Sequence, residues 1–278
     1  MLGSSFLGVY AHAGFLNGMN ASGLRPARVV GASAGALAGS LYASGLRGDA
    51  LRDAALDLKL RRSFVDAGVC LRLPGVISTL WSSGLFHGRK TVECLRARFG
   101  TVDLAELDLP LDLAVTNVET SRLGIRREGP LAELVMASCA VPVLFCIQHV
   151  DAKRYLDGGI AGELPFEHLL DDPRIDTVIL HRIRHESGSV PGFFKSSVGN
   201  SIGVTRRTIS HEVHRLRMEL ARIRGKRVIE MKTTTPFPGL FSHHRAPICY
   251  KLGFETGLGI RDLDNLPPLE TSDPLVVV

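Results

Sequence analysis

The stretch Arg28-Val29-Val30-Gly31-Ala32-Ser33-Ala34-Gly35 decides the fold class of this chain. Its β-branched first half predicts a short buried strand, and the small residues from Ser33 to Ser44 predict a tightly packed helix directly after it. Gly31 and Gly35 flank the serine in a Gly-x-Ser-x-Gly pattern, in which a strand turns sharply into a helix and leaves no room for side chains. Such a turn exposes the Ser33 hydroxyl where the helix N-terminus favours developing negative charge. The pattern predicts a nucleophilic serine; the plain alternative is a turn rich in glycine and serine without a chemical role.

Segments of helical and strand character alternate along the rest of the chain. Helices are predicted over 8–22, 48–60, within 84–98 and over 199–224, and strands over 111–118, 177–181 and 227–232. This alternation favours an α/β layered fold. Because no repeat, low-complexity tract or linker interrupts it, we expect a single domain over 1–278, with a motif-bearing part over 1–170 and a C-terminal part over 171–278.

The composition is that of an ordinary globular protein. Of the 278 residues, 45% are hydrophobic and 22% are charged, which excludes a disordered or collagen-like chain. No run of eighteen apolar residues predicts a membrane-spanning helix, and the N-terminus lacks the features of a signal peptide. Five widely spaced cysteines are an odd number in a chain too long to need disulfides, so we expect reduced thiols and a cytoplasmic location.

The net charge of +5 is concentrated in one segment. Residues 195–232 hold ten Lys or Arg against three Glu, a charge of +7, so the remainder carries −2. The helix expected over 199–224 holds most of these basic residues. It is a candidate for peripheral contact with an anionic membrane surface, and a solvated helix face is the plain alternative. Nucleic-acid binding is not predicted.

A second site is the stretch Tyr155-Leu156-Asp157-Gly158-Gly159, which follows Ala137-Ser138-Cys139-Ala140-Val141-Pro142. Two glycines after an aspartate indicate a tight turn that presents the carboxylate, although Asp-Gly is also a routine turn dipeptide. Thirty-two residues precede Ser33, which is room for one strand and one helix. An α/β-hydrolase is therefore not expected, because several strands come before the nucleophile in that fold.

Taken in order, these motifs resemble those of the patatin-like phospholipase family. The resemblance runs from Gly3 to about Leu170 and includes Ala11-His12-Ala13-Gly14-Phe15-Leu16, Gly84-Leu85-Phe86-His87-Gly88 and Leu164-Pro165. It implies a three-layer α/β/α fold with a central, mostly parallel sheet, and hydrolysis of lipid acyl esters of the phospholipase A or lysophospholipase type. It also implies a dyad with Ser33 as nucleophile and Asp157 as base, without a catalytic histidine, a metal or an organic cofactor.

The family's glycine-rich oxyanion loop corresponds here to Gly3-Ser4-Ser5-Phe6-Leu7-Gly8, in which Ser5 replaces a glycine. By this resemblance, the expected oxyanion donors are the backbone N–H groups of Gly3, Ser4, Ser5, Phe6 and Ala34. Family members have a strand before this loop, and two residues, Met1 and Leu2, precede it here. We therefore expect a first strand that is mostly missing, with neighbouring strands that lack ladder partners.

Two alternative functions stay open, a non-catalytic patatin-fold protein that binds lipid or a partner, and an esterase for small esters. If Asp157 is not the base, His168 is the first histidine to consider. His211 and His214 lie three residues apart and do not match a zincin helix, so no metal site is predicted. His12 is expected to be a packing or helix-bracing residue.

Overall fold

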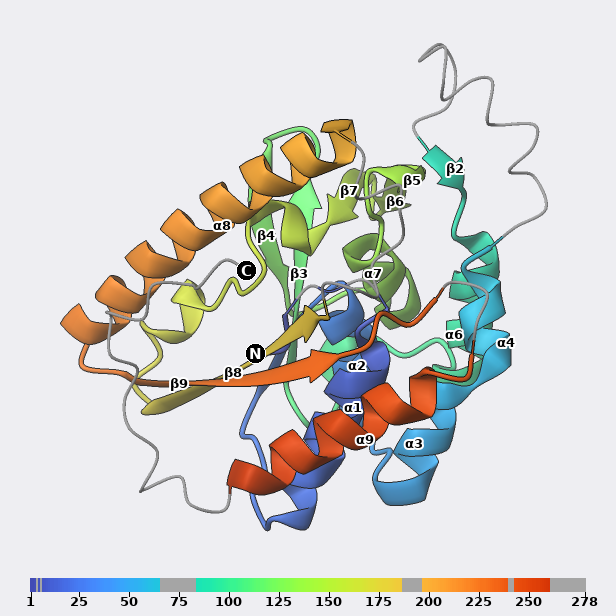
Figure 1. Cartoon of the computed structure of the whole chain (residues 1–278). Helices are drawn as coiled ribbons and strands as arrows, with labels where there is room; N and C mark the ends of the chain where they lie inside the picture. The colour runs from blue at the N-terminus through green and yellow to red at the C-terminus, as the bar shows by residue number, and fades with distance from the viewer. Residues whose placement is uncertain (4, 6, 66–83, 187–196, 240–242, 261–278) are drawn as a thin grey trace.

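The computed structural model describes residues 1–3, 5, 7–65, 84–186, 197–239 and 243–260. A central sheet separates helices on its two faces, as Figure 1 shows. Strands β1 (Val29–Ala32) and β3 (Leu111–Asn117) are parallel neighbours, and β8 (Thr177–His185) is parallel to β9 (Arg227–Thr235). The antiparallel strand β4 (Arg122–Arg126) lies on the other edge of β3. β7 (Lys153–Asp157) follows β1 along the first edge, antiparallel to β3, and pairs with β6 (Gln148–Val150). A small separate pair joins β2 (Gly84–Phe86) to β5 (Val143–Phe145) in parallel.

The first three residues connect the two parallel pairs. Leu2 is 2% exposed and forms parallel bridges with Gly31 on one side and His181 on the other. Its N–H donates to the Val30 carbonyl at 2.7 Å, and its carbonyl accepts from the Ala32 N–H at 3.2 Å. The expectation that the neighbouring strands lack ladder partners is therefore wrong at these positions, because Met1, Leu2 and Gly3 supply them.

Successive side chains of a strand point to opposite faces of the sheet, and this divides the core into two parts. Val29 belongs to the large cluster, which includes residues of α1 (Val9–Ala21), α2 (Ala34–Ala43) and α9 (Ala246–Leu258). Its neighbour Val30 belongs to a second cluster with the 3₁₀ segment η3 (Glu167–Leu169) and α8 (Ser197–Ile223). Because successive strand side chains point to opposite faces, this alternation gives the layers of an α/β/α fold. The predicted fold class is confirmed.

Helices α1 and α9 pack at backbone contact distance. A Cβ at Gly14 would lie 2.0 Å from the Tyr250 carbonyl oxygen, and one at Gly253 would lie 2.0 Å from that of Ala11. No side chain fits at either position, so glycine is required on both helices. This contact holds α1 firmly under the sheet, and α1 carries His12.

The remaining described α-helices belong to the layer of α1, α2 and α9, because each contributes to the large cluster. They are α3 (Gly48–Leu56), α4 (Leu58–Ser63), α6 (Arg89–Phe99) and α7 (Leu131–Ser138), and the further 3₁₀ segments are η1 (Leu104–Glu106) and η2 (Gly158–Ala161). The single helix predicted over 48–60 is wrong, because the Asp57 side chain accepts from the Lys59 N–H at 2.8 Å and starts a new helix. Within the described ranges, no helix is both long and apolar enough to span a membrane.

Candidate active site

Ser33 lies at the turn from β1 to α2, where the Gly-x-Ser-x-Gly pattern predicts it. Its backbone has φ 54° and ψ −118°, a conformation that is strained for a residue with a side chain. A Cβ at Gly31 would lie 2.5 Å from the Gly35 carbonyl oxygen, and one at Gly35 would lie 2.3 Å from that of Leu2. The two glycines therefore allow the strand, the helix and the N-terminal segment to meet around a serine that is 7% exposed.

Asp157 ends β7 and is followed by the predicted turn. Its side chain is 3% exposed, and Oδ1 accepts a hydrogen bond of 2.6 Å from the Gly159 N–H. A Cβ at Gly158 would lie 2.1 Å from the Ala114 carbonyl oxygen, so the turn presses directly against β3. The motif thus fixes the carboxylate through its own backbone and brings it to the middle of the sheet.

Asp157 lies beside the serine turn, on the same edge of β3. Ala32, the residue before Ser33, pairs with Ala114 on β3, and the next residue of β3, Val115, pairs with Asp157 on β7. β4 pairs with both Ala114 and Val115 on the opposite edge of β3, so β1 and β7 follow one another along a single edge. The topology therefore brings together two residues of the chain that lie far apart in sequence.

Three consecutive residues at the end of α7 hold both backbones. The Ser138 hydroxyl accepts from the Ser33 N–H at 3.0 Å and donates to the Ala114 carbonyl at 2.6 Å. The Cys139 thiol donates to the Ser33 carbonyl at 3.2 Å, and the Ala140 carbonyl accepts from the Asp157 N–H at 3.0 Å. We call residues 138–140 the clamp. The motifs of the family resemblance include these residues, but their bonds to Ser33 and Asp157 were not predicted.

Burial and charge keep the clamp's thiol neutral. Burial raises the pKa of Cys139 well above its ordinary value, and the negative charge of Asp157 raises it further. The thiol therefore remains a hydrogen-bond donor rather than a competing nucleophile.

The expected oxyanion donors are placed only in part. Ser4 and Phe6 lie outside the described residues, whereas Gly3, Ser5 and Ala34 lie within them. The Gly3 N–H donates to the His181 carbonyl at 3.1 Å, so it is engaged within the sheet. Ala34 is the first residue of α2, and the first N–H groups of a helix have no partner within it. Of the described donors, Ala34 fits the predicted role and the Gly3 N–H does not.

Histidines surround the start of this loop, which the sequence did not indicate. The Gly3 carbonyl accepts from His12 Nε2 at 2.8 Å, and the Ser5 hydroxyl lies 3.3 Å from His185 Nε2. His12 is fully buried, as expected of a packing residue, but it also makes a polar contact with the loop. The strand predicted over 177–181 includes His181, whereas His185 lies four residues beyond it, on the same face of the longer observed strand β8.

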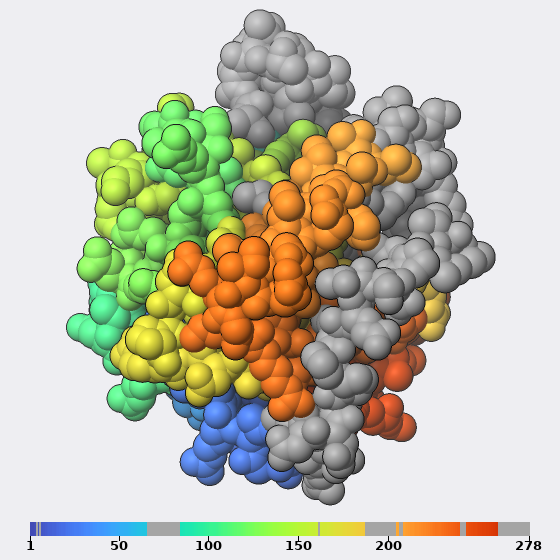
Figure 2. Space-filling view, turned by 90° about the vertical axis from the view of Figure 1, so that its left-hand side faces the viewer, coloured from blue at the N-terminus to red at the C-terminus, as the bar shows by residue number. Residues whose placement is uncertain are grey.

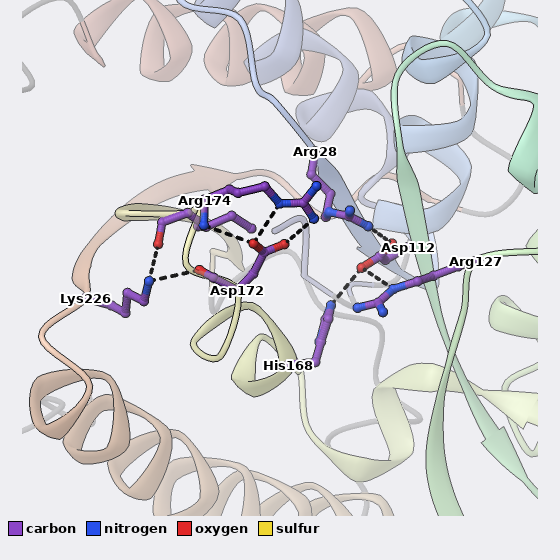
Figure 3. Close-up of polar contacts among 8 residues, drawn as sticks. Arg28, Asp112, Arg127, His168, Asp172, Arg174 and Lys226 are labelled. Carbon is purple, nitrogen blue, oxygen red and sulfur yellow. Dashed lines mark hydrogen bonds and ion pairs between the residues drawn. The ribbon is translucent and has the colours of Figure 1, made fainter.

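His168 lies at the opposite end of the sheet. Its Nε2 lies 3.0 Å from Asp112, which pairs with Val30 near the start of β1, whereas Ser33 follows the end of that strand. Figure 3 shows this cluster, in which Asp112 also binds Arg28 at 2.7 Å and Arg127 at 3.2 Å. Burial alone would raise the pKa of Asp112, but hydrogen bonding by His168 and the charge of Arg28 outweigh it and lower that pKa. His168 is therefore not a candidate base for Ser33.

Several arginines of the basic helix α8 form ion pairs with neighbouring carboxylates. Arg217 is 8% exposed, binds Glu167 at 2.7 Å and donates to the Leu164 carbonyl at 3.1 Å. Other pairs join Arg215 to Glu212, Arg222 to Glu219 and Arg224 to Asp171. Figure 2 shows α8, in orange, running across the surface of this face of the molecule. Part of the predicted positive charge is thus neutralised by neighbouring carboxylates.

The outer side of α8 is apolar. Ile209, Leu216 and Ile223, spaced seven residues apart, are 58%, 59% and 67% exposed, and Leu220 between them is 36% exposed. These side chains form a stripe about 21 Å long on one helix face. An exposed apolar stripe of this length indicates a contact surface. Among the described residues, no group of three His, Cys, Asp or Glu side chains could hold a metal ion.

A sequence model described as patatin-like phospholipase matches residues 2–170. NTE family proteins of Mycobacterium bovis and Mycobacterium tuberculosis, both described as uncharacterized, are 28% identical over 164 residues, which are 59% of this chain and 43% of each relative. The chain thus spans less than half the length of these relatives.

The crystal structure of VipD from Legionella pneumophila is similar in fold, with a TM-score of 0.51 over 94% of this chain and 66% of that chain. The two are 14% identical, so the likeness concerns the fold alone. The family model, by contrast, covers more than half of the sequence, including both the serine turn and the aspartate turn. The chain belongs to the patatin-like phospholipase family.

Proposed function

We propose that this chain hydrolyses acyl esters of lipids through an acyl-enzyme on Ser33, with Asp157 as the base. Membership of the family supports lipid hydrolysis as the class of activity. The observation that carries the assignment to these two residues is the clamp, which binds the Ser33 N–H and carbonyl and the Asp157 N–H from consecutive residues. A rigid backbone on both sides is what a pair without a third member requires.

In the proposed reaction, the Ser33 hydroxyl oxygen attacks the ester carbonyl carbon while its proton passes to the Asp157 carboxylate. The tetrahedral oxyanion accepts hydrogen bonds from the backbone N–H group of Ala34 and from N–H groups of the loop after Gly3. The C–O bond to the alcohol then breaks and the alcohol leaves with the proton. Water attacks the acyl-enzyme by the same route and releases the carboxylic acid.

A carboxylate is a weak base toward an alcohol, because the pKa of aspartate is ordinarily about 3.9. Proton transfer therefore has to accompany acyl attack in a site from which water is largely excluded. The 7% and 3% exposures of Ser33 and Asp157 support this requirement. The two residues would act as one unit, so the protein is expected to lose most of its activity when either one is replaced.

A fluorophosphonate probe tests the proposal, because it labels an activated serine. The wild-type protein is expected to be labelled, and Ser33→Ala is not. Ser40→Ala is a matched control, since Ser40 is a fully buried serine of the same helix whose hydroxyl donates to the Leu37 carbonyl. Absence of labelling in the wild-type protein would instead favour the non-catalytic binding protein.

Hydrolysis assays separate the remaining alternatives. Ser33→Ala and Asp157→Asn should each remove nearly all activity, and the double variant should be scarcely worse than either. Full activity of Asp157→Asn would exclude the dyad. A series of p-nitrophenyl esters should favour long acyl chains, and a preference for the shortest ester would indicate a small-ester esterase.

We further propose that the outer face of α8 contacts an anionic lipid surface. The apolar stripe and the flanking arginines support this, since buried apolar area and basic charge both contribute to interfacial binding. Sedimentation with anionic vesicles should show binding that weakens with salt and is reduced in the double variant Leu216→Ser, Ile223→Ser. Equal binding to neutral vesicles, or binding unchanged in this variant, would return α8 to a solvated helix face.

A further inference from the structure

A linear network of five polar contacts runs from Gly3, at the start of the oxyanion loop, through the core of the molecule. It links α1, β8, β9 and α9 through buried or half-buried side chains. In order, the contacts are Gly3 O to His12 Nε2 at 2.8 Å, His12 Nδ1 to His181 Nδ1 at 2.8 Å, His181 Nε2 to Thr233 Oγ1 at 2.8 Å, Thr233 Oγ1 to Thr256 Oγ1 at 2.8 Å, and Thr256 Oγ1 to Leu252 O at 2.9 Å.

The Gly3 carbonyl determines which atoms of this network donate their hydrogen bonds. A carbonyl only accepts, so His12 carries its proton on Nε2. Burial lowers the pKa of His12 to about 3 and that of His181 well below its ordinary value, so both imidazoles are neutral near pH 7. His12 Nδ1 therefore accepts, His181 carries its proton on Nδ1, and His181 Nε2 accepts from the Thr233 hydroxyl. The two histidines must be opposite tautomers.

The number of available protons shows how far along the network the donors all point toward Gly3. Two neutral imidazoles and two threonine hydroxyls supply four protons for five contacts. Because the first three donors are committed toward Gly3, Thr233 has no proton left for Thr256, and the Thr256 hydroxyl donates to the Leu252 carbonyl. The donors of Thr233, His181 and His12 thus all point toward Gly3. We call these three residues the ordered part of the network, and Thr256 lies outside it.

We propose that His12 and His181 are positioning residues that hold the start of the oxyanion loop as a pair of neutral imidazoles of opposite tautomer. Both polar backbone atoms of Gly3 are engaged by this pair, since its N–H donates to the His181 carbonyl and its carbonyl accepts from His12. The Phe15 ring stacks on His181 with centroids 3.9 Å apart and holds the imidazole plane. This proposal rests on the proposed hydrolase function for its consequence in catalysis.

A second contact of the same kind supports the assignment. His185 lies four residues after His181 on the same face of β8, and its Nδ1 lies 3.0 Å from the Thr235 hydroxyl. Its other nitrogen lies 3.3 Å from the Ser5 hydroxyl. Two histidine–threonine pairs of β8 and β9 therefore hold the described part of the loop at two positions, Gly3 and Ser5.

Two-bond ¹H–¹⁵N correlation spectra test the tautomers without any assay of activity. At pH 7 we expect His12 with its proton on Nε2 and His181 with its proton on Nδ1. The same tautomer for both rings, or a doubly protonated ring in either, would overturn the pair as proposed.

Labelling of Ser33 by the fluorophosphonate probe tests the positioning role. His12→Leu keeps an apolar side chain of similar size and removes the donor to Gly3, and it should slow labelling by about 100-fold, the loss that a misplacement of 1 Å can cause. His12→Gln carries an amide N–H near the position of Nε2 and should recover most of this loss. Thr256→Val, beyond the ordered part, should stay within about 2-fold of wild type.

The outcomes separate this proposal from the proposed function. Labelling of His12→Leu at the wild-type rate, or of His12→Gln as slowly as His12→Leu, overturns the positioning role while the hydrolase proposal stands. Absence of labelling in the wild-type protein overturns the hydrolase proposal and the catalytic consequence drawn here, and the spectra then decide the tautomers. If His12→Leu does not fold, Thr233→Val replaces it and should label more slowly than Thr256→Val.

Discussion

Mild acid should destabilise this protein through its buried histidine pair. His12 and His181 are both fully buried, and burial lowers the pKa of His12 from 6.5 to about 3. In the unfolded chain each histidine binds a proton below pH 6.5, whereas in the folded chain His12 binds one only below about pH 3. Between these values the unfolded state holds more protons, so stability is present above pH 6.5 and is lost as the pH falls.

The magnitude follows from the same pKa values. A histidine that stays neutral when folded loses about 1.4 kcal/mol of stabilisation for each pH unit below its unfolded pKa. At pH 5 the loss is about 2 kcal/mol for His12, and about 4 kcal/mol when His181 is included. The carboxylates with lowered pKa values, such as Asp112 and Glu230, act in the same direction but ordinarily titrate below pH 4.5, so pH 5–7 isolates the histidines.

Urea denaturation at pH 7, 6 and 5 measures this loss in the wild-type protein and in His12→Gln. The free energy of unfolding of the variant should fall by about 2 kcal/mol less between pH 7 and pH 5, because one titrating group has been removed. His243 and the Met1 amine, whose pKa values burial also lowers, are present in both proteins and cancel. Parallel pH dependences of the two proteins would refute the assignment of neutral, buried imidazoles.

Three further variants test the packing around the site. Ser138→Ala should lower the free energy of unfolding by about 2–4 kcal/mol, because it leaves two buried backbone groups without a partner, and a loss below 1 kcal/mol in urea denaturation would contradict the clamp. Gly35→Ala places a Cβ 2.3 Å from a backbone oxygen and should destabilise by more than about 3 kcal/mol, whereas Gly259→Ala meets no atom within 4 Å and should change thermal stability little. Arg217→Met keeps the apolar stem but loses the ion pair with Glu167, and should destabilise by about 1–3 kcal/mol; protection of α8 from limited proteolysis equal to that of wild type would argue against its anchoring role.

The elements predicted from the sequence were those with a strong local pattern. The strand and helix on either side of Ser33 appear as β1 and α2, and the β-branched runs at 111–118 and 227–232 appear as β3 and β9. Strands β4, β6 and β7 were not predicted, because they are short and carry exposed or half-buried residues on both faces. β4 and β7 form because β3 offers them an edge, and β6 forms on β7; these edges exist only in the folded sheet.

The candidate site shows the same division. The serine turn and the aspartate turn were predicted, because each depends on neighbouring residues, with Gly31 and Gly35 around one and Gly158 and Gly159 after the other. The clamp and the histidine pair were not. Ser138 meets Ser33 across 105 positions, and His12 meets His181 across 169.

The sequence by itself determined the local steric conditions of this protein, namely where a chain must turn without room for a side chain and where apolar residues must be buried. Sequence motifs in order were enough to indicate the family and to name Ser33 and Asp157. Tertiary structure alone decided how these residues are held, because hydrogen bonds between buried groups depend on which strands become neighbours. A serine, a cysteine or a histidine has the same local sequence pattern whether its hydrogen-bond partner is water or a distant backbone group, and only the fold supplies that partner.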